Sequence, residues 1–285
     1  MLASYYSAIA LLLLNVRSRR KQTPVNENVP HGSPRPRLMA SRVRNVLIGR
    51  KGRVWVKVET GLVRGLWLHL NLAREEKYWL GYHESEVQEL LRKLIVPGTV
   101  AYDVGAHIGF FSMAMARLMG PEGQIFAFEP DPESAERIGE HVLRNNLQRG
   151  IRVLREAVWS YSCRMGIPFK RGNIKRDHGG ISADGYSPPL ADGECISVPS
   201  ITLDSLVQEG YPIPDIVKID VEGGECEVLK GGRELFSQAK TKLICEMHSR
   251  EAVNWIIDWL KQKGYASQSL TPHDTLPRII FARRG

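Results

Sequence analysis

The stretch from Thr99 to Ser112 limits most strongly what this chain can fold into. It begins with a short apolar run that is typical of a buried strand, and Asp103 near the end of that run carries a charge that needs a partner. Gly105 and Gly109 allow a tight turn and a close approach of a ligand to the backbone. The apolar residues that follow predict a buried helix, which ends at Gly120. A strand, a glycine turn and a helix open the nucleotide site of a doubly wound α/β domain, although a plain βα turn shows the same pattern.

A second strand is predicted over residues 124–128, and it ends at Glu129. The spacing from Asp103 leaves room for one helix and one turn. An acidic residue at the tip of the second strand is placed to accept hydrogen bonds from both hydroxyls of a ribose, whereas a solvated loop carboxylate is the alternative. Asp131 is expected to cap the next helix, with Pro132 in its first position.

Two cofactors fit a glycine turn of this kind. A dinucleotide favours Gly-x-Gly-x-x-Gly, in which the amides of the helix meet the pyrophosphate. The turn here runs from Gly105 to Gly109 without a middle glycine, and Asp103 beside it repels a pyrophosphate. S-adenosylmethionine carries an α-ammonium and a sulfonium and no phosphate, so a carboxylate beside the turn suits it. The residues therefore favour a methyl donor over NAD.

Further segments of the chain repeat the pattern of one known family: residues 103–110, 128–132, 201–204, 217–231 and 246–248. Through them the chain resembles the FkbM family of S-adenosylmethionine-dependent methyltransferases, over a span from about Tyr78 to the C-terminus. The segment from Lys218 to Gly223 is the most specific, since all class I methyltransferases share the glycine turn. His107 departs from the family, which usually has Asn at this place, so its contact with the cofactor would depend on pH.

The resemblance implies an α/β fold of the class I methyltransferase (Rossmann-like) type. Its core is a doubly wound, mostly parallel seven-stranded sheet with an antiparallel last strand. Before this domain, a predicted hairpin and an amphipathic helix over residues 85–95 form a small N-terminal β-α cap. The expected division of the chain is a basic tail (1–41), the cap (42–97) and the methyltransferase domain (98–285).

The candidate residues for binding the donor lie on the glycine turn and on the tips of the predicted strands. The tip of the third strand is included on the resemblance alone, because it borders the adenine in class I methyltransferases. Together the candidates are Asp103, Gly105, Ala106, His107, Gly109, Glu129, Pro130, Glu156, Ala157 and Asp220.

The candidate catalytic residues follow two neighbouring strands, predicted over residues 215–219 and 242–245. Ligands bind at the carboxyl ends of strands near the switch point, so Asp220, Glu246 and His248 are expected in one cleft. Either His248 or Asp220 is the general base that takes the proton of an alcohol acceptor. A divalent metal ion held by the three residues is the alternative, and the metal-free mechanism is favoured. The alternative to a catalytic role is that these carboxylates and the histidine are structural residues.

Acceptor contacts are expected from Glu222 and, in the cap, from Tyr82 and Glu84. Residues 160–200 are rich in glycine, proline and charge, which is typical of a lid or a disordered insertion. Basic side chains there either meet an acidic or phosphorylated substrate or form a solvated charge run: Lys170, Arg171, Lys175 and Arg176. The family implies O-methylation of a hydroxyl on a small molecule, sugar or glycan. An NAD or nucleotide-sugar oxidoreductase and a non-catalytic S-adenosylmethionine-binding module are the alternatives.

The net charge of +8 is concentrated in the N-terminal part, because residues 1–64 hold 13 Lys and Arg against two Glu. The remaining chain is slightly acidic and lacks the basic footprint of a nucleic-acid-binding domain. The apolar run 8–14 is too short to span a bilayer, so membrane contact through residues 1–21 is an alternative to a plain extension. Four cysteines without metal spacing predict reduced thiols and a cytoplasmic protein.

Overall fold

The computed structural model describes residues 52–170, 195–272 and 275–285 of the chain. The predictions for the tail, for its membrane contact and for the centre of the 160–200 segment therefore lie outside the described residues. This includes the side chains of the basic residues expected to meet an acidic substrate, which are Lys170, Arg171, Lys175 and Arg176. No helix of the described residues combines the length and the apolar character that crossing a membrane requires.

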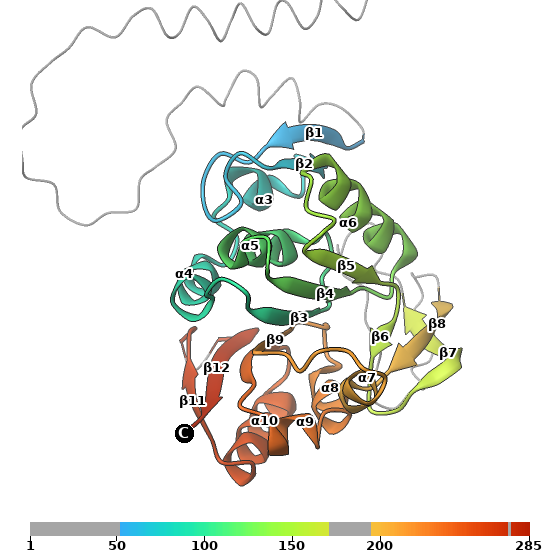
Figure 1. Cartoon of the computed structure of the whole chain (residues 1–285), viewed down its shortest axis with the longest axis vertical. Coiled ribbons are helices and arrows are strands. Elements are labelled where there is room, and N and C mark those ends of the chain that lie inside the picture. Colours follow the sequence, from blue (N-terminus) through green and yellow to red (C-terminus); the bar gives the residue numbers. More distant parts are fainter. Residues whose placement is uncertain (1–51, 171–194, 273–274) are drawn as a thin grey trace, which may run out of the picture. The chain divides into compact units, whose positions relative to one another are not determined.

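The described strands include a central seven-stranded sheet in the order β11-β12-β10-β9-β3-β4-β5 (Figure 1). Every pair in it is parallel except those of β12, which is antiparallel to β10 and β11. The order reverses between β3 and β9, and this switch point is where doubly wound sheets bind ligands. The predicted fold class is therefore confirmed. The strands are β3 (Val100–Val104), β4 (Gln124–Phe128), β5 (Ile151–Leu154), β9 (Ile216–Ile219), β10 (Lys242–Met247), β11 (Tyr265–Ser269) and β12 (Arg278–Arg284).

Helices cover both faces of this sheet (Figure 1). One face carries α4 (Ser85–Leu94), α5 (Phe110–Met119) and α6 (Pro132–Arg144). The other carries α7 (Leu203–Gln208), α8 (Glu225–Lys230), α9 (Leu235–Gln238) and α10 (Arg250–Gln262). The expected cap of α6 is confirmed, because the side chain of Asp131 accepts a hydrogen bond from the backbone N–H of Ser134 and Pro132 opens the helix.

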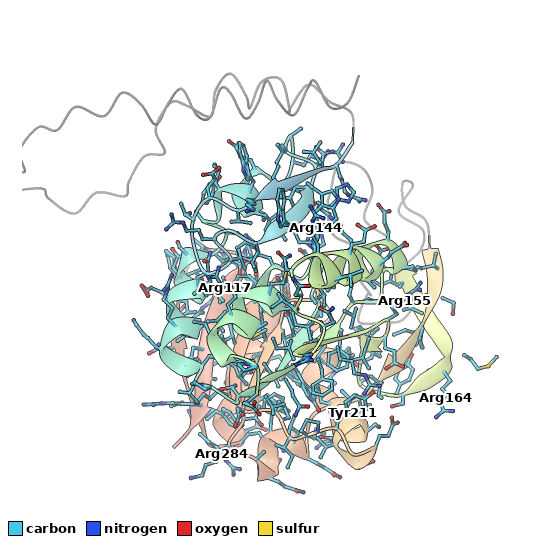
Figure 2. All side chains as sticks on the ribbon, turned by 45° about the horizontal axis from the view of Figure 1, so that its top comes forward. Arg117, Arg144, Arg155, Arg164, Tyr211 and Arg284 are labelled. Atoms are coloured by element: carbon cyan, nitrogen blue, oxygen red, sulfur yellow. The ribbon has the colours of Figure 1, made fainter. Side chains whose placement is uncertain are left out.

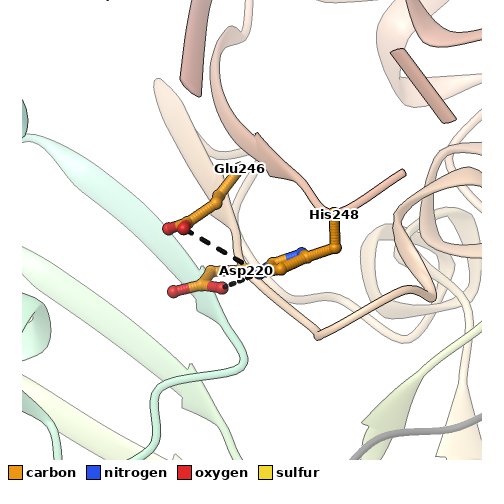
Figure 3. Close-up of side chains that lie close together, drawn as sticks. All are labelled: Asp220, Glu246 and His248. Carbon is orange, nitrogen blue, oxygen red and sulfur yellow. Dashed lines mark ion pairs between the residues drawn. The ribbon is translucent and has the colours of Figure 1, made fainter. Parts of the chain in front are cut away.

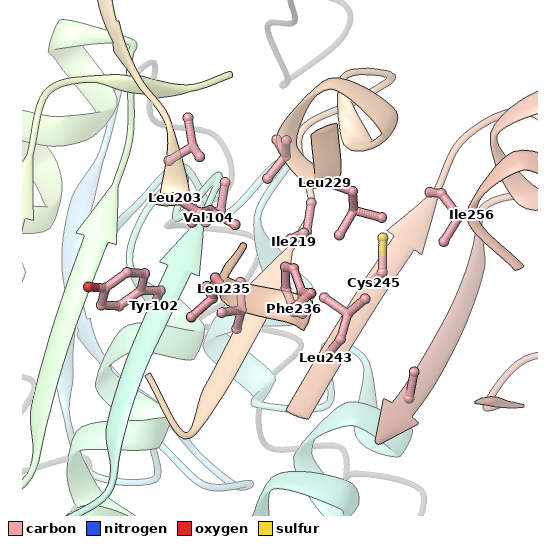
Figure 4. Packing of buried hydrophobic residues seen from close by; sticks show 14 of the residues in the cluster. Tyr102, Val104, Leu203, Ile219, Leu229, Leu235, Phe236, Leu243, Cys245 and Ile256 are labelled. Carbon is pink, nitrogen blue, oxygen red and sulfur yellow. The ribbon is translucent and has the colours of Figure 1, made fainter. Parts of the chain in front are cut away.

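The two faces of the sheet differ in chemistry at its centre. Val104 of β3, Ile219 of β9 and Cys245 of β10 belong to one apolar cluster, which packs against the helices α7–α10 (Figure 4). Side chains alternate along a strand, so the residues one step away point to the opposite face. Asp103 and Lys218 are such residues, and they lie directly opposite each other in the pairing of β3 with β9. This second face carries charge under α4 and α5.

The predicted cap is present as the antiparallel hairpin of β1 (Val54–Lys57) and β2 (Trp67–Leu70), followed by the predicted helix α4. A short helix, α3 (Glu76–Leu80), lies between them and was not expected. Arg144 of α6 lies over the rings of Trp55 and Trp67, with its guanidinium carbon 5.8 and 5.1 Å from their centroids (Figure 2). These cation–π contacts hold the cap against α6.

Polar contacts between α6 and the cap are buried. The guanidinium of Arg137 donates two hydrogen bonds to the Glu75 carboxylate, at 2.7 and 2.6 Å, and a third to the carbonyl oxygen of His69. The ring of His141 accepts a hydrogen bond from the backbone N–H of His69 at 2.8 Å and donates one to the carbonyl oxygen of Ile108 at 2.9 Å. His141 thus connects the cap directly to the glycine turn.

The interpretation of residues 160–200 as a region without regular structure is wrong at both ends. The strands β7 (Cys163–Lys170) and β8 (Cys195–Ile201) pair antiparallel, and β8 pairs with β6 (Ala157–Val158). The apolar residues Ile167, Phe169 and Val198 form a small core of their own with Trp159. Gly166 and Pro168 interrupt the alternation along β7, which hid the strand from a search for periodicity.

Candidate functional site

The glycine turn after β3 joins three strand ends. The backbone N–H groups of Gly105 and Ala106 both donate to the carbonyl oxygen of Phe128 at the end of β4. Gly105 has φ +80°, and a Cβ built there would lie 1.8 Å from the carbonyl oxygen of Asp220 at the end of β9. A side chain at position 105 is therefore excluded by Asp220. Gly105 was expected to let a ligand approach, and the structure adds that it lets the two loops meet.

The rest of the turn is equally constrained. Gly109 has φ +76°, and a Cβ there would lie 2.9 Å from Ile138 of α6, so this glycine permits close helix packing. His107 has φ 50°, in the left-handed region, where Asn is more readily accommodated than most residues. The His107 ring lies 3.4 Å from the Tyr78 hydroxyl of the cap, measured at Nδ1.

Asp103 lies below the turn with only 1% of its surface exposed. Its Oδ2 accepts a hydrogen bond from the Ser112 hydroxyl at 2.5 Å, while its Oδ1 is buried without a hydrogen-bond partner. Burial raises the pKa of Asp103, and the neighbouring charge of Lys218 opposes that shift. An orphaned carboxylate oxygen in a buried place is costly unless a cation or donor satisfies it. Asp103 thus fits the role expected of it beside a positively charged donor.

Glu129 is held in place by the backbone of the two loops. Its Oε2 accepts from the N–H of His107 at 2.8 Å and its Oε1 from the N–H of Asp131 at 2.9 Å. Burial raises the pKa of Glu129 to about 8, against the effect of these two hydrogen bonds. Each carboxylate oxygen has room for a second hydrogen bond, so the side chain is oriented but not saturated. Pro130 follows it, half-buried, between β4 and α6.

The residues expected to border an adenine lie apart from this turn. Ala157 is buried in the core of the small sheet beside Trp159. Glu156 stands between β5 and β6, and burial raises its pKa. Their role in binding a donor stays a prediction.

The predicted catalytic residues come together around His248 (Figure 3). Its Nε2 lies 3.4 Å from an oxygen of Glu222 and 3.8 Å from oxygens of both Asp220 and Glu246. Its Nδ1 lies 2.7 Å from Oε1 of Glu225. These residues follow the ends of β9 and β10, except Glu246, which is the penultimate residue of β10. We call this group of a histidine and four carboxylates the acidic cluster.

The acidic cluster changes the protonation of its members. Burial opposes a charge on His248, but its hydrogen bond to Glu225 and the nearby carboxylates outweigh this and raise the pKa of His248 to about 9. Burial raises the pKa of Glu246 above its ordinary value, and the charge of Asp220 raises it further. Near neutral pH, the raised pKa favours the imidazolium form of His248, which donates a hydrogen bond from Nδ1 to Glu225 and faces three further carboxylates with Nε2.

Two residues at the site have a structural place that the sequence did not reveal, although Lys218 lies in the most family-specific segment and Glu225 lies two residues after it. Glu225 is fully buried, and the oxygen that faces His248 also accepts the N–H of Gly223 at 2.8 Å. Lys218 is buried with its Nζ 3.1 Å from Oδ2 of Asp220. The signal in the sequence that could have identified both residues is a charged side chain beside a predicted strand tip.

The cap contributes to the same region unevenly. Tyr82 is 54% exposed, and no described contact joins it to the acidic cluster. Glu84 has φ 42°, and its Oε1 lies 2.9 Å from Nε2 of His83, while its Oε2 is buried without a hydrogen-bond partner. Its charge raises the pKa of Glu246, so the two carboxylates lie close enough to interact. Glu84 remains a candidate for an acceptor contact, and Tyr82 is the weaker of the two.

The donor set of the acidic cluster also suits a cation. Asp220, Glu246 and His248 each offer one ligand atom, and the three atoms lie within 4.8 Å of one another. Glu225 holds the other ring nitrogen of His248, which is the outer-shell arrangement that orients histidine ligands in metal sites. A divalent ion would then replace the proton on Nε2. These residues therefore fit the metal alternative, and oxygen and imidazole ligands do not specify which metal.

Comparison with known proteins places these residues in context. The profile of the methyltransferase FkbM domain matches residues 103–267. Hexuronic acid methyltransferase AglP of Haloferax volcanii is 28% identical over 209 residues, which cover 69% of this chain and 80% of that protein. The 2-O-methyltransferase NoeI of Sinorhizobium fredii is 29% identical over 174 residues, covering 58% of this chain and 68% of that one. Apart from the cap residues, every candidate site residue lies inside the matched range.

Solved structures are similar as well. A crystal structure of methyltransferase FkbM from Methylobacillus flagellatus has a TM-score of 0.45 and 17% identity, covering 66% of this chain and 44% of that chain. An S-adenosylmethionine-dependent O-methyltransferase from Thermotoga maritima has a TM-score of 0.46 and 12% identity, covering 84% of this chain and 80% of that chain.

Proposed function

The chain belongs to the methyltransferase FkbM domain family, and from this premise we propose that it transfers a methyl group from S-adenosylmethionine to a hydroxyl group of a sugar or glycan. The family is one of S-adenosylmethionine-dependent methyltransferases, so the oxidoreductase alternative is not favoured. The observation that carries the proposal is the contact between the two loops at Gly105. It brings the turn expected to bind the donor against Asp220, the first residue of the acidic cluster.

The donor side requires a place for positive charge and for a ribose. The unpartnered Oδ1 of Asp103 supports an interaction with a cationic group of the donor. Glu129 is fixed by two backbone N–H groups and keeps acceptor capacity for ribose hydroxyls. The backbone of Gly105, Ala106, His107 and Gly109, with Pro130, shapes the turn between these two carboxylates. We assign Glu156 and Ala157 to the adenine end only on the resemblance.

Methyl transfer makes and breaks few bonds. The C–S bond of the sulfonium breaks, a C–O bond to the acceptor forms, and S-adenosylhomocysteine leaves. The hydroxyl proton must go to a base as the C–O bond forms. His248 is already protonated near neutral pH, since its pKa is raised to about 9. We therefore assign the base to the carboxylate of Asp220, while the imidazolium of His248 orients Asp220, Glu222 and Glu246.

The metal alternative uses the same three side chains. A divalent ion held by Asp220, Glu246 and His248 would lower the pKa of the acceptor hydroxyl as a Lewis acid. In that case His248 is neutral, and Asp220 is a ligand rather than the base. Methylation that survives exhaustive chelation supports the metal-free mechanism. Activity that is lost on chelation and restored by Mg²⁺ or Mn²⁺ supports the metal.

Two relatives inform the acceptor class. AglP is named for hexuronic acid and NoeI for a 2-O position, so the first name points to a sugar acid and the second to oxygen as the acceptor atom. On this basis we place hexuronic acids and their glycosides first among the acceptors to test. We assign contacts with sugar hydroxyls to Glu222 of the acidic cluster and to Glu84 of the cap.

The donor is tested by calorimetry with S-adenosylhomocysteine and NAD side by side. Micromolar binding of S-adenosylhomocysteine without binding of NAD is expected, and the reverse would overturn the donor assignment. Turnover is tested with S-adenosylmethionine and a panel of glucuronosides and galacturonosides, with the matched glucosides and galactosides as neutral controls. Mass spectrometry that finds a methyl ether on a panel member supports the proposal. Tight donor binding without any methylated product would favour a non-catalytic module.

A further inference from the structure

Lys218 occupies an unusual place in the central sheet. Among the residues that the structure describes, it is the one lysine that is buried, with 3% of its surface exposed. It is the third residue of the four-residue strand β9, directly opposite Asp103 of β3 and Ile244 of β10. Its neighbours on β9, Val217 and Ile219, face the apolar core on the other side of the sheet. Lys218 therefore stands at the switch point on the charged face.

The contacts of Lys218 reach both halves of the site. Its Nζ lies 3.1 Å from Oδ2 of Asp220, two residues along the same strand direction. The same ammonium lies 4.9 Å from the ring centroid of Phe111, in the first turn of the helix that follows the glycine turn. Phe111 also packs against His83 of the cap, at 5.5 Å between ring centroids. One cation thus contacts the acidic cluster and the helix behind the donor turn.

The charges around Lys218 explain how a buried ammonium is tolerated. Burial alone lowers the pKa of a lysine, because the charged form loses its hydration. Here the carboxylates of Asp220, Asp103, Glu84 and Glu246 outweigh burial and raise the pKa of Lys218 above its ordinary value. The effect is mutual, since Lys218 opposes the upward shift of the pKa of both Asp103 and Glu246. Lys218 is the counter-charge shared by the donor side and the acceptor side.

We propose that Lys218 is a positioning residue for methyl transfer, whose buried ammonium fixes the Asp220 carboxylate and balances the charge that Asp103 and Glu246 bring to the same face. This inference rests on the proposed function. Without the ammonium, the Asp220 carboxylate would lose the hydrogen bond that Lys218 donates to it from β9. Two neighbouring carboxylates would then repel each other, and one of them would take up a proton. The base would be both misplaced and partly neutralised.

The test compares Lys218→Met with a matched control, Lys242→Met. Lys242 is half-buried and is the first residue of the neighbouring strand β10, where it pairs with Ile216, two register positions before Lys218. Three quantities are measured: the affinity for S-adenosylhomocysteine by calorimetry, the pKa of Glu246 by carboxyl-carbon NMR, and kcat and KM against pH with an active acceptor of the uronoside panel. The first two need no acceptor.

Lys218→Met is expected to lower kcat at pH 7 by about tenfold to a hundredfold while the KM for S-adenosylmethionine changes less than about threefold. The pKa of Glu246 rises by about one unit, and the acidic limb of the kcat profile moves to higher pH by a similar amount. Lys242→Met is expected to match the wild type in all three quantities. A pKa of Glu246 and a kcat profile that are the same in Lys218→Met and wild type would overturn the proposal.

A second variant covers the case in which Lys218→Met fails to fold. Lys218→Arg keeps the charge but moves it, because the guanidinium is larger and planar. The acidic limb is expected to stay at its wild-type pH while kcat falls, and a shifted limb in Lys218→Arg would contradict the charge-balancing role. A failure of the proposed function would give a different result, because the wild-type protein would then bind no S-adenosylhomocysteine. If the wild-type protein binds S-adenosylhomocysteine and the Lys218 variants match it in the pKa of Glu246 and in the kcat profile, the result counts against the role of Lys218 alone.

Discussion

Two histidines of this protein, the buried His141 and the half-buried His248, lie in opposite surroundings. His141 lies where α6 meets the cap, between a backbone N–H and a carbonyl oxygen. Burial lowers its pKa to about 3, so it is a neutral ring that accepts at one nitrogen and donates at the other. His248 lies among carboxylates that raise its pKa to about 9. The same side chain is an uncharged connector in one place and a cation in the other.

The difference shows what each region is built for. At the joint around His141, the polar groups satisfy one another, and Arg137 is matched by the Glu75 carboxylate. In the acidic cluster, four carboxylates face one imidazole and one lysine, so negative charge is in excess before any ligand binds. A satisfied network stabilises a fold, whereas an unbalanced one costs stability and is typical of functional sites. The joint holds the cap on α6, and the cluster has the charge imbalance that we propose serves catalysis.

The largest expected effect comes from removing the charged ring. His248→Gln should lower kcat about a hundredfold to a thousandfold, because the carboxylates lose the donor that orients them. Affinity for S-adenosylhomocysteine should change little, since the ring has no described contact with the glycine turn. Steady-state kinetics with calorimetry checks this, and His69→Gln is the control, because that half-buried ring lies in the cap, where it pairs with the exposed Glu140 and stacks on Trp55. Full activity of His248→Gln would remove the acidic cluster from the mechanism.

Removing the neutral ring should act on stability instead. His141→Ala leaves the N–H of His69 and the carbonyl of Ile108 without partners, and it opens a cavity under the cap. We expect the free energy of unfolding to fall by about 2 to 4 kcal/mol, measured by urea denaturation. At a temperature where the variant is folded, kcat should stay within about threefold of wild type. A loss of kcat as large as that of His248→Gln would show that the two regions are not separable.

The free energy of unfolding at acidic pH should depend on His141. Its folded-state pKa of about 3 lies below the unfolded value, so the unfolded chain binds a proton that the folded chain does not bind. Its contribution is complete above about pH 6.5 and is lost toward pH 3, by up to about 1.4 kcal/mol for each pH unit. The difference between wild type and His141→Gln in denaturation at several pH values isolates this slope. Parallel curves below pH 6 would contradict the buried neutral ring.

The stability of the protein at basic pH should depend on His248, with a smaller change per pH unit than His141 causes at acidic pH. Its folded-state pKa of about 9 lies above the unfolded value, so its contribution is complete below about pH 6.5 and is lost as the pH rises through 9. Because the side chain is partly exposed, solvent screening reduces the total loss, and the average slope is expected to be lower than for a fully buried group. Comparing His248→Gln with wild type between pH 6.5 and 9 measures it. A variant that loses stability as steeply as wild type would mean that the ring is neutral in the folded protein.

The central sheet could be predicted well from the sequence, whereas the acidic cluster could be predicted only in part. Asp103, Glu129 and Asp220 could be placed because strand order and the switch point determine where strand tips lie. The pairing of Glu225 with His248 could not, because it joins two loops through side-chain orientations that no periodicity records. Counting charges near a strand tip does not reveal which of them are buried, and so Lys218 received no role.

The cap shows the same limit. Its hairpin and its amphipathic helix have clear periodicity, and both were predicted. The five-residue helix α3 was missed, since so short an element is decided by tertiary packing. The strands β7 and β8 were missed because their residues face a core of only a few side chains.

The near-contact at Gly105 has a consequence for anyone who wishes to redirect this enzyme to other acceptors. The backbone of the loop after β9 runs so close to the glycine turn that no side chain fits between them. Grafting a foreign version of residues 220–225 would therefore displace the glycine turn along with the acidic cluster, unless the graft keeps the path of the Asp220 carbonyl. Diversification is better aimed at Glu84 and its neighbours in the cap, where a changed side chain leaves that path untouched.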